Sequence, residues 1–353
     1  MFACHVGVVV SFMLCGVLSF ITEWVDPQSG LIHALKLVYY PSSCEVELFR
    51  CSKPGGFFLK KTATSLDVCS LYVGNRVTLF GRNILIKDYF DELTREKFCA
   101  TCAIIKPRAY HRIGEIMEAI QAFPGLSITK LEMVRISKES AELFVLGHPE
   151  AGYLANLLTG DASVVMALSG EDAVGAWNAL GAQFGDLVHA SASKSFAERE
   201  LDYFFKEKQW SSLAIGSFCS VCIVLPHAFA ECGGKIVSRI LGLDLEISAM
   251  RLQTVSNPSE FFQVYRGAIQ HFTETCAALG AGMCLVMEVR SAQSVVETLR
   301  ALVGPRDPEL ARQIRPQSLR AQFGVDKIRN AVHCTDLEEN AVYESNYFFP
   351  PCA

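Results

Sequence analysis

The chain contains two copies of one stretch of 17 residues, HASASKSFAERELDYFF at 189–205 and HCTDLEENAVYESNYFF at 333–349. They align without a gap at a spacing of 144 residues. A second pair, FCATCAIIKP at 98–107 and FCSVCIVLP at 218–226, recurs at a spacing of 119 to 120 residues. Similarity at a fixed distance is typical of an internal repeat. The sequence therefore predicts two repeats, 98–205 and 218–349, of which the first has lost about 24 residues from its interior.

Each repeat reads as strand, helix, strand, strand, helix and a closing helix plus strand. In the first repeat, Ile113, Ile116, Ile120 and Phe123 follow Pro107 at the spacing of one helix face. The short runs SVVMAL at 163–168 and GMCLVMEV at 282–289 are suited to central strands. The resulting βαββαβ order predicts an α+β protein with two ferredoxin-like α/β sandwiches in tandem.

Residues 20–93 belong to neither repeat. Short strand-like runs such as CEVELFR, RVTLFG and ILIKDY alternate there with turn clusters such as PSS, KPGG and VGN. This alternation predicts a small all-β domain. The charged stretch ELTREK at 92–97 is expected to be the linker to the first repeat.

Composition limits the class of protein. The chain has 353 residues, of which 50% are apolar and 20% charged, and its formal net charge is -5. The low charge density and the ordinary numbers of Pro (13) and Gly (25) exclude a disordered or collagen-like chain. With 32 basic against 37 acidic residues and no basic stripe, we expect no nucleic-acid partner.

The first residues form an apolar leader, MFACHVGVVVSFMLCGVLSFI at 1–21. Its uncharged run of about 16 residues is shorter than a spanning helix requires. It also lacks the Lys or Arg that precedes a signal core. For residues 1–19 we favour an apolar first strand or an unusual N-terminal extension over a secretory signal or an anchor, and we expect no membrane partner. A buried strand explains the other uncharged run, 213–230.

Fourteen cysteines allow an oxidised framework, but a chain of this length does not need such staples, so we favour free thiols. Two C-x-x-C pairs, Cys99/Cys102 and Cys219/Cys222, resemble half-sites for zinc. Each pair lies in a strand-like run, where residues three apart point to opposite faces. We therefore expect no metal bound by protein side chains.

His333 is the centre of the strongest candidate site. It precedes an expected helix start, and four or five arginines lie in the 30 residues before it. Imidazole nitrogen can accept a phosphoryl group, and a helix start with arginines offsets its charge. DLEE at 336–339 has the spacing of a capping box, with Asp336 as the cap and Glu339 reaching back. The alternative is a capped helix behind a solvated arginine-rich loop, with His333 as a core residue.

With NAVHCTD at 330–336, the downstream Glu344 and YFF at 347–349, the second repeat resembles the end of a nucleoside diphosphate kinase, and both repeats match that family. Over residues 20–349 the arrangement resembles one ciliary and flagellar member type. In that type a small N-terminal domain shared with other doublet-microtubule proteins precedes two kinase-like domains. The fragments FITEWVDP, VYYPSSCEVELF and LYVGNRVTLFGRNILIKDY carry the resemblance of the first domain.

The resemblance implies roles for six residues. His333 matches the phosphorylated histidine, and Glu344 the carboxylate that holds its ring. Arg300 and Arg320 match the two phosphate-binding arginines, Asn330 the ribose-contacting asparagine and Thr335 the hydroxyl near the histidine. By the family mechanism His333 would take the terminal phosphate of a magnesium-bound ATP or GTP and pass it to a diphosphate.

Three departures weaken this expectation. Leu225 stands where the family has lysine, Phe262 where it has tyrosine, and Arg306 where it has a threonine that contacts phosphate. Losing one electrostatic partner commonly costs about 10²- to 10³-fold in rate. We therefore expect two or three such losses to leave little activity.

The first repeat departs in a different way. It keeps Lys106, His189, Ser191 and Glu200, but its missing residues fall where the second repeat has the arginine-rich loop. By the same matching, two of the expected side chains are replaced, one phosphate arginine by Asn178 and the asparagine by Asp186. An acidic group beside a phosphate site opposes binding. We expect this repeat to be inactive.

Three functions fit the sequence. The function that we favour is a fixed component of the axonemal doublet microtubule, such as a protein of its inner lumen. It would be located in the cytoskeleton of cilia or flagella, with tubulin and other axonemal proteins as partners. The alternative is a working nucleoside diphosphate kinase that acts through His333 with Mg²⁺ and ATP or GTP. The third is a nucleotide-binding sensor that no longer transfers phosphate.

Overall fold

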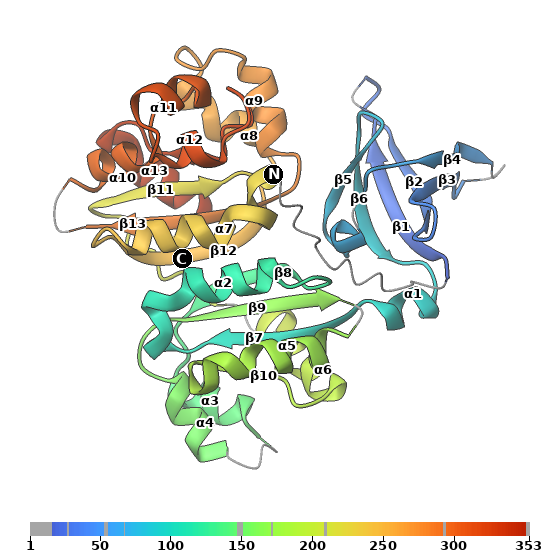
Figure 1. Ribbon diagram of the computed structural model, residues 1–353, viewed down its shortest axis with the longest axis horizontal. Coiled ribbons are helices and arrows are strands. Elements are labelled where there is room, and N and C mark those ends of the chain that lie inside the picture. The colour runs from blue at the N-terminus through green and yellow to red at the C-terminus, as the bar shows by residue number, and fades with distance from the viewer. Residues whose placement is uncertain are drawn as a thin grey trace, which may run out of the picture. The chain divides into compact units, whose positions relative to one another are not determined.

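The computed structural model describes residues 16–350, except 27, 53–55, 67, 147–150, 171, 208–209 and 292–293. The chain divides into two compact units, residues 1–96 and 97–353 (Figure 1). Of the apolar leader, residues 1–15 lie outside the described residues. Its last part enters strand β1 (Leu18–Val25), where Leu18 and Phe20 are fully buried.

The first unit is built on one antiparallel sheet with the order β4-β3-β2-β1-β6-β5. The strands after β1 are β2 (Ile32–Tyr40), β3 (Glu45–Arg50), β4 (Phe57–Ala63), β5 (Arg76–Leu79) and β6 (Arg82–Tyr89). Leu35, Leu37, Ile84 and Ile86 alternate with more exposed neighbours and form the core with β1. The all-β prediction for this part of the chain is confirmed.

The expected linker at 92–97 is a helix, α1 (Glu92–Lys97). Thr94 explains its attachment, because this buried side chain accepts a hydrogen bond from Ser19 N–H (2.9 Å). Asp91 accepts one from Thr94 N–H (2.8 Å), which satisfies a free donor at the helix start. The charged composition of this segment suggested a linker, but the solvent-facing side chains of a short helix are often charged as well.

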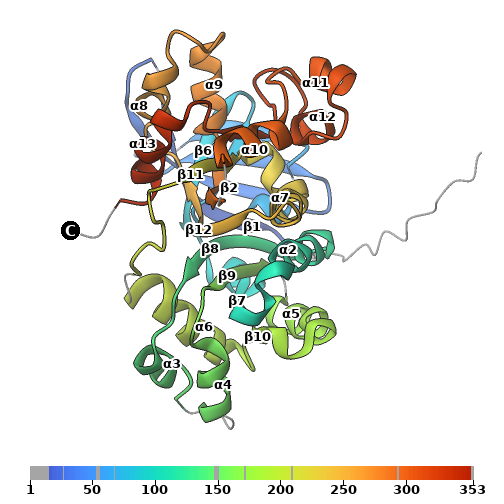
Figure 2. The same cartoon turned by 90° about the vertical axis from the view of Figure 1, so that its left-hand side faces the viewer.

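The second unit contains both repeats in one antiparallel sheet of order β10-β7-β9-β8-β12-β13-β11-β14 (Figures 1 and 2). The first repeat contributes β7 (Cys99–Ile105), β8 (Ser127–Val134), β9 (Ser163–Gly170) and β10 (Val188–Ala190). The second contributes β11 (Cys219–Val224), β12 (Glu246–Thr254), β13 (Met283–Arg290) and β14 (Val332–Cys334). The two halves have the same strand order, so the predicted pair of ferredoxin-like folds is confirmed.

Helices cover both faces of this sheet. Those of the first repeat are α2 (Ile113–Ala122), α3 (Lys138–Phe144), α4 (Ala151–Leu158), α5 (Ala173–Gly181) and α6 (Lys194–Asp202). Those of the second are α7 (Pro226–Leu241), α8 (Pro258–Phe261), α9 (Phe272–Leu279), α10 (Val295–Val303), α11 (Pro308–Ile314), α12 (Leu319–Phe323) and α13 (Glu338–Phe348). One hydrophobic core, to which α2, α5, α7 and α10 contribute, spans both repeats.

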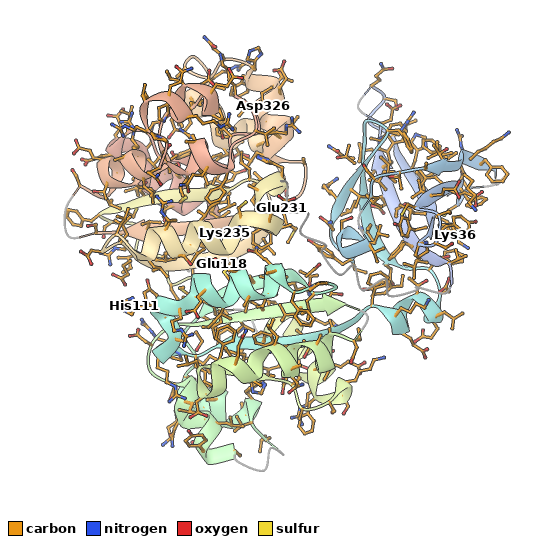
Figure 3. The ribbon with its side chains drawn as sticks, viewed as in Figure 1. Lys36, His111, Glu118, Glu231, Lys235 and Asp326 are labelled. Carbon is orange, nitrogen blue, oxygen red and sulfur yellow. The ribbon has the colours of Figure 1, made fainter. Side chains whose placement is uncertain are left out.

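The repeats join along β8 and β12 and along α2 and α7. Arg251 of β12 pairs with Glu132 of β8, and its Nε donates to Glu132 Oε1 (3.1 Å). Glu118, labelled on α2 in Figure 3, accepts from Ser238 Oγ of α7 (2.6 Å). The two helices approach so closely at Gly114 that a Cβ there would collide with the backbone of Ser238.

The order of elements departs from the prediction in two places. In each repeat helices connect the second and third strands, namely α3 with α4 and α8 with α9, where adjacent strands were expected. The closing helix, α6 or α13, follows the closing strand. The expected helix at the first β-α junction begins with a 3₁₀ turn, Pro107–Arg112, whereas Pro226 at the same place in the second repeat begins α7 directly.

The predicted capping box is wrong. The residue before α13 is Leu337, and no side chain caps the helix. Asp336 instead donates its backbone N–H to Tyr265 Oη (3.3 Å), and its carboxylate lies 4.0 Å from Arg300. In the first repeat the equivalent of Leu337 is Ser193, which does cap α6.

The ten cysteines whose side chains are described are all free thiols. Burial raises the pKa of Cys219 and of Cys334 to about 12. Such thiols stay protonated at neutral pH, a state that binds metal poorly. Among the described residues, no cluster of His, Cys, Asp or Glu could hold a metal ion, and no helix is long and apolar enough to cross a bilayer.

Candidate active site in the second repeat

His333 lies on β14, the edge strand, directly opposite Ile223 of β11. Its Nε2 is 3.2 Å from Glu344 Oε2 on α13. The histidine is 8% exposed and the carboxylate is fully buried. A neutral imidazole that faces a carboxylate carries its proton on that nitrogen, so the lone pair is on Nδ1. The structure thus brings these two predicted site residues together.

Three donors hold the Glu344 carboxylate. His333 and Thr335 Oγ1 (3.1 Å) share Oε2, and Tyr265 Oη donates to Oε1. Thr335 is also fixed, since its Oγ1 accepts from Val221 N–H (2.9 Å). Thr335 thus orients the carboxylate and does not open into the cavity described below.

Aromatic rings enclose the imidazole. Phe261, Phe262 and Tyr265 lie edge-on to His333, with ring centroids 5.3 to 5.6 Å away. Burial, and then the Glu344 carboxylate, raise the pKa of the Tyr265 hydroxyl, so it remains a proton donor. Tyr265 was missed by the sequence analysis. Its place three residues after Phe262, one helical turn on, is the signal that could have found it.

A cavity of about 490 Å³ opens beside the histidine. His333, four arginines and two carboxylates line it, the charged residues being Arg300, Arg306, Arg315, Arg320, Glu297 and Asp336. Arg300 comes from α10, whose counterpart in the first repeat is α5, and the other three come from the segment between α10 and β14, of which the first repeat keeps only a short turn. The cavity is suited to an anion larger than a single phosphate.

The two predicted phosphate arginines are held differently. Arg320 is buried, and its guanidinium donates to Val332 O (3.1 Å) and Gly304 O (2.9 Å). It therefore fixes the backbone beside His333 as well as facing the cavity. Arg300 is exposed, and its one described carboxylate partner is Asp336 at 4.0 Å. Arg300 can turn to a ligand at little cost.

Asn330 does not line the cavity. It is buried, and its Nδ2 donates to Arg306 O (3.3 Å) and Lys327 O (3.4 Å). In this structure the side chain holds the arginine-rich loop against the strand. Its expected contact with a ribose stays a prediction.

The first repeat keeps the same histidine arrangement. His189 Nε2 is 3.0 Å from Glu200 Oε2, and Ser191 Oγ donates to the same oxygen (2.7 Å). His189, Ser191 and Glu200 are all buried. Lys106 is 3% exposed, and burial lowers its pKa, which nearby Asp186 partly offsets.

Internal contacts occupy the anion side of this first site. Asp186 pairs with Arg108 (3.0 Å) and accepts from Tyr153 Oη (2.9 Å). Asn178, the residue in place of a phosphate arginine, donates to Val174 O and Ser191 O. The loop that carries α11 and α12 in the second repeat is reduced here to the turn 182–187. Both partners of the Arg108–Asp186 ion pair therefore belong to the first repeat itself.

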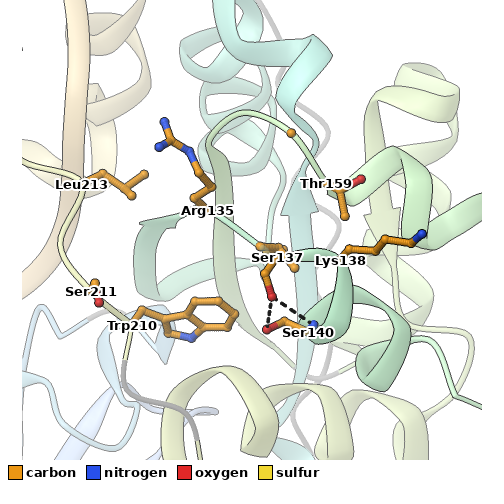
Figure 4. A pocket seen from close by; sticks show the side chains of 10 residues that line it. Arg135, Ser137, Lys138, Ser140, Thr159, Trp210, Ser211 and Leu213 are labelled. Atoms are coloured by element: carbon orange, nitrogen blue, oxygen red, sulfur yellow. Dashed lines mark hydrogen bonds between the residues drawn. The ribbon is translucent and has the colours of Figure 1, made fainter.

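A second cavity, of about 460 Å³, is lined by neither His189 nor His333, and Figure 4 shows the side chains around it. Arg135, Ser137, Ser140 and Trp210 are among its lining residues, and Ser137 Oγ bonds to Ser140 Oγ (2.9 Å). In Figure 4 Lys138 points away from Trp210. No histidine or carboxylate is among the described side chains that line this cavity.

Comparison with known proteins identifies the class. The family model for nucleoside diphosphate kinase matches residues 100–184 and 219–353. The chain therefore belongs to the nucleoside diphosphate kinase family. It is 34% identical to nucleoside diphosphate kinase homolog 7 of Rattus norvegicus, over 94% of this chain and 92% of the relative. Homolog 7 of Mus musculus is 32% identical over the same shares. The resemblance to the homolog 7 type is confirmed.

A single-domain relative covers only one repeat. The nucleoside diphosphate kinase of Aquifex aeolicus (strain VF5) is 34% identical over 133 residues, which are 37% of this chain and 92% of the relative. The long matches to the homolog 7 proteins therefore include residues outside any one kinase repeat.

Proposed function

We propose that the second repeat is a nucleoside diphosphate kinase that transfers the terminal phosphate of a nucleoside triphosphate through His333. The observation that carries this proposal is the buried His333–Glu344 pair, which borders a cavity containing four arginines. The sequence alone favoured a structural role. The presence of this pair beside an arginine-lined cavity leads us to place phosphoryl transfer first.

The residues divide the work between nucleophile and support. Glu344 holds the Nε2 proton, so Nδ1 attacks the terminal phosphorus as the bond to the diphosphate breaks. Positive charge then develops on the ring, and Glu344 offsets it. Arg300 and Arg320 bind the phosphate oxygens. The same steps in reverse pass the phosphoryl group from His333 to a second nucleoside diphosphate.

Magnesium fits this site only as a partner of the nucleotide. The carboxylates that line the cavity are Glu297 and Asp336, too few for a protein-built site for this ion. The ion would neutralise phosphate charge when it enters with ATP or GTP.

The proposal predicts where phosphohistidine forms. After incubation with ATP labelled at the terminal phosphate, we expect acid-labile label on the parent and on His189→Ala, and its loss from His333→Ala. His189 is the matched control because it has an equivalent carboxylate partner, Glu200, but no arginine-lined cavity was found beside it among the described residues. Equal labelling of the parent and His333→Ala would contradict the assignment.

We also propose a structural role, as a component of the axonemal doublet microtubule that contacts tubulin and neighbouring proteins. Two observations favour it. The first repeat keeps its fold although Asp186 and Arg108 occupy its site, and the chain carries a separate β unit that a kinase does not require. If the first repeat and the β unit serve as surfaces that bind microtubule proteins, both observations are explained.

The structural role predicts retention on the cytoskeleton. We expect the protein to stay with flagellar axonemes after extraction with detergent and moderate salt. A near-neutral protein cannot rely on charge to bind a strongly acidic polymer, so apolar contact should dominate. Deletion of residues 20–93 should weaken retention more than His333→Ala does. Release of most of the parent by detergent alone would contradict this role.

A further inference from the structure

The second site lacks a cation at the position that follows its first strand. Leu225 comes directly after β11, as Lys106 comes after β7 in the first repeat. The leucine is 5% exposed and packs in a cluster with Phe262 and Tyr265. An alkyl side chain at this position offers a phosphate neither a charge nor a hydrogen bond.

Another cation lies close to that position. Leu225 N–H donates to Ala331 O (2.9 Å), and the residue before Ala331 is Asn330. The side chain of Asn330 donates to the backbone oxygen of Arg306 (3.3 Å). Two hydrogen bonds therefore connect Leu225 to Arg306 through two consecutive residues. The side chain of Arg306 lines the same cavity as His333.

The guanidinium of Arg306 lacks a partner. Among the described residues, no acceptor lies within hydrogen-bond or ion-pair distance of it, although it is half-buried. Arg320 differs, since it donates to two carbonyl oxygens, and Arg300 differs, since it has Asp336. Burial, and then the charge of Arg320, lower the pKa of Arg306. A cation that is partly desolvated, crowded by another cation and unpaired is stabilised by an anion.

We propose that Arg306 binds the phosphates of a nucleoside diphosphate or triphosphate in the second site, in place of the cation missing at Leu225. This inference rests on the proposed kinase function. It also changes the interpretation of Arg306, which stands where the family has threonine. At the sequence level Arg306 counted as a lost phosphate contact. In the structure it supplies the charge that Leu225 lacks.

The two repeats support this exchange. The first has Lys106 and a shortened loop without an equivalent of Arg306, and it has Asp186 near the lysine. The second has Leu225 and a full loop that carries Arg306 into the cavity. Lys106 in the first repeat and Arg306 in the second thus bring a cation to the site from different elements.

Calorimetric titration of the full chain with ADP tests the proposal. Arg306→Met removes the charge and keeps most of the length. We expect it to weaken ADP binding by about 10-fold or more, the usual scale for a charge-assisted contact. Arg306→Lys should retain most of the affinity. Arg135→Met, the same change at an exposed arginine of the first repeat, should leave binding unchanged.

A rescue variant separates charge from loop folding. In the Arg306→Met background, Leu225→Lys should recover part of the lost affinity, because it returns a cation to the same side of His333. Thermal unfolding of each variant shows whether the repeat remains folded. If Leu225→Lys disrupts the core, the comparison of Arg306→Met with Arg306→Lys still decides the question.

The outcomes distinguish the two proposals. If the parent binds ADP and forms phosphohistidine while Arg306→Met binds ADP equally well, the assignment to Arg306 is wrong and the kinase function stands. If the parent does not bind ADP, the kinase function is wrong and the role of Arg306 with it.

Discussion

Glu288 is fully buried on β13, although its position is apolar in the first repeat, where Ala167 occupies it. Its carboxylate accepts from the backbone N–H groups of Ile215 (2.7 Å) and Gly216 (3.0 Å), from Ser248 Oγ (2.7 Å) and from Ser345 Oγ. It connects the segment before β11, the strand β12 and helix α13. Ser345 is next to Glu344, so this carboxylate also fixes the helix that supports His333.

We expect Glu288→Ala to lower the free energy of unfolding by about 3 kcal/mol, because it leaves several buried donors unpaired. Urea unfolding measures the change. Glu288→Gln, which still accepts hydrogen bonds, should cost less, and Glu231→Ala, at an exposed position labelled in Figure 3, should change little. Equal stability of Glu288→Ala and the parent would show that the segment before β11 and helix α13 hold without this carboxylate.

At the level of residues, the sequence predicted what lies within one short motif. His333 and Glu344 are eleven residues apart, and a single strand-to-helix turn brings them together. Tyr265 lies 79 residues from Glu344 in the chain, and Glu288 lies 57 residues from Ser345. No local pattern reports such contacts. The capping box failed because Asp336 is drawn to Tyr265 and to Arg300, which the four-residue pattern does not include.

At the level of elements, β8 and β12 meet at one charged pair. Glu132 and Arg251 hold the same position in the two repeats, since they are 119 residues apart and face each other across the two strands. Pairing of two identical repeats would place Glu against Glu or Arg against Arg. The pair therefore favours contact between unlike repeats.

Charge reversal tests this junction. Both side chains are about three-quarters buried, with 27% and 21% exposure. Glu132→Arg or Arg251→Glu alone should lower the free energy of unfolding by about 1–2 kcal/mol, and the double reversal should recover most of it. Reversing the exposed pair Lys206–Asp202 is the control. If the double variant loses the sum of the two single losses, the pair does not act as a unit.

The strands and the first helix of each repeat could be predicted because their apolar residues repeat at fixed intervals. Helices α3, α4, α8 and α9 were missed, because their short sequences carry few periodic positions. Helix α1 was taken for a linker because its six residues are mostly charged. Pairing between β8 and β12 could not be predicted, since each repeat read alone has a complete pattern.

At the level of the whole molecule, internal repetition was sufficient to predict two similar folds after a β region. It could not reveal that the two folds share one sheet and one core. It also could not show how the cations are distributed, because Arg306 reaches the cavity through a loop whose path depends on Asn330 and Ala331. In the sequence, Leu225 and Arg306 therefore looked like two separate departures from the family, although the structure places both near one site.

The second unit has no two-fold symmetry, because the two repeats that share its sheet differ. A dimer of identical subunits has a two-fold axis, and rotation about this axis presents the same surface again. Such a dimer therefore cannot distinguish the two directions along a filament. Here one half carries an arginine-lined cavity and the other an exposed ion pair, in a single sheet. Turning this body end for end exchanges unlike surfaces. The proposed structural role therefore predicts a single orientation on a polymer with a plus and a minus end.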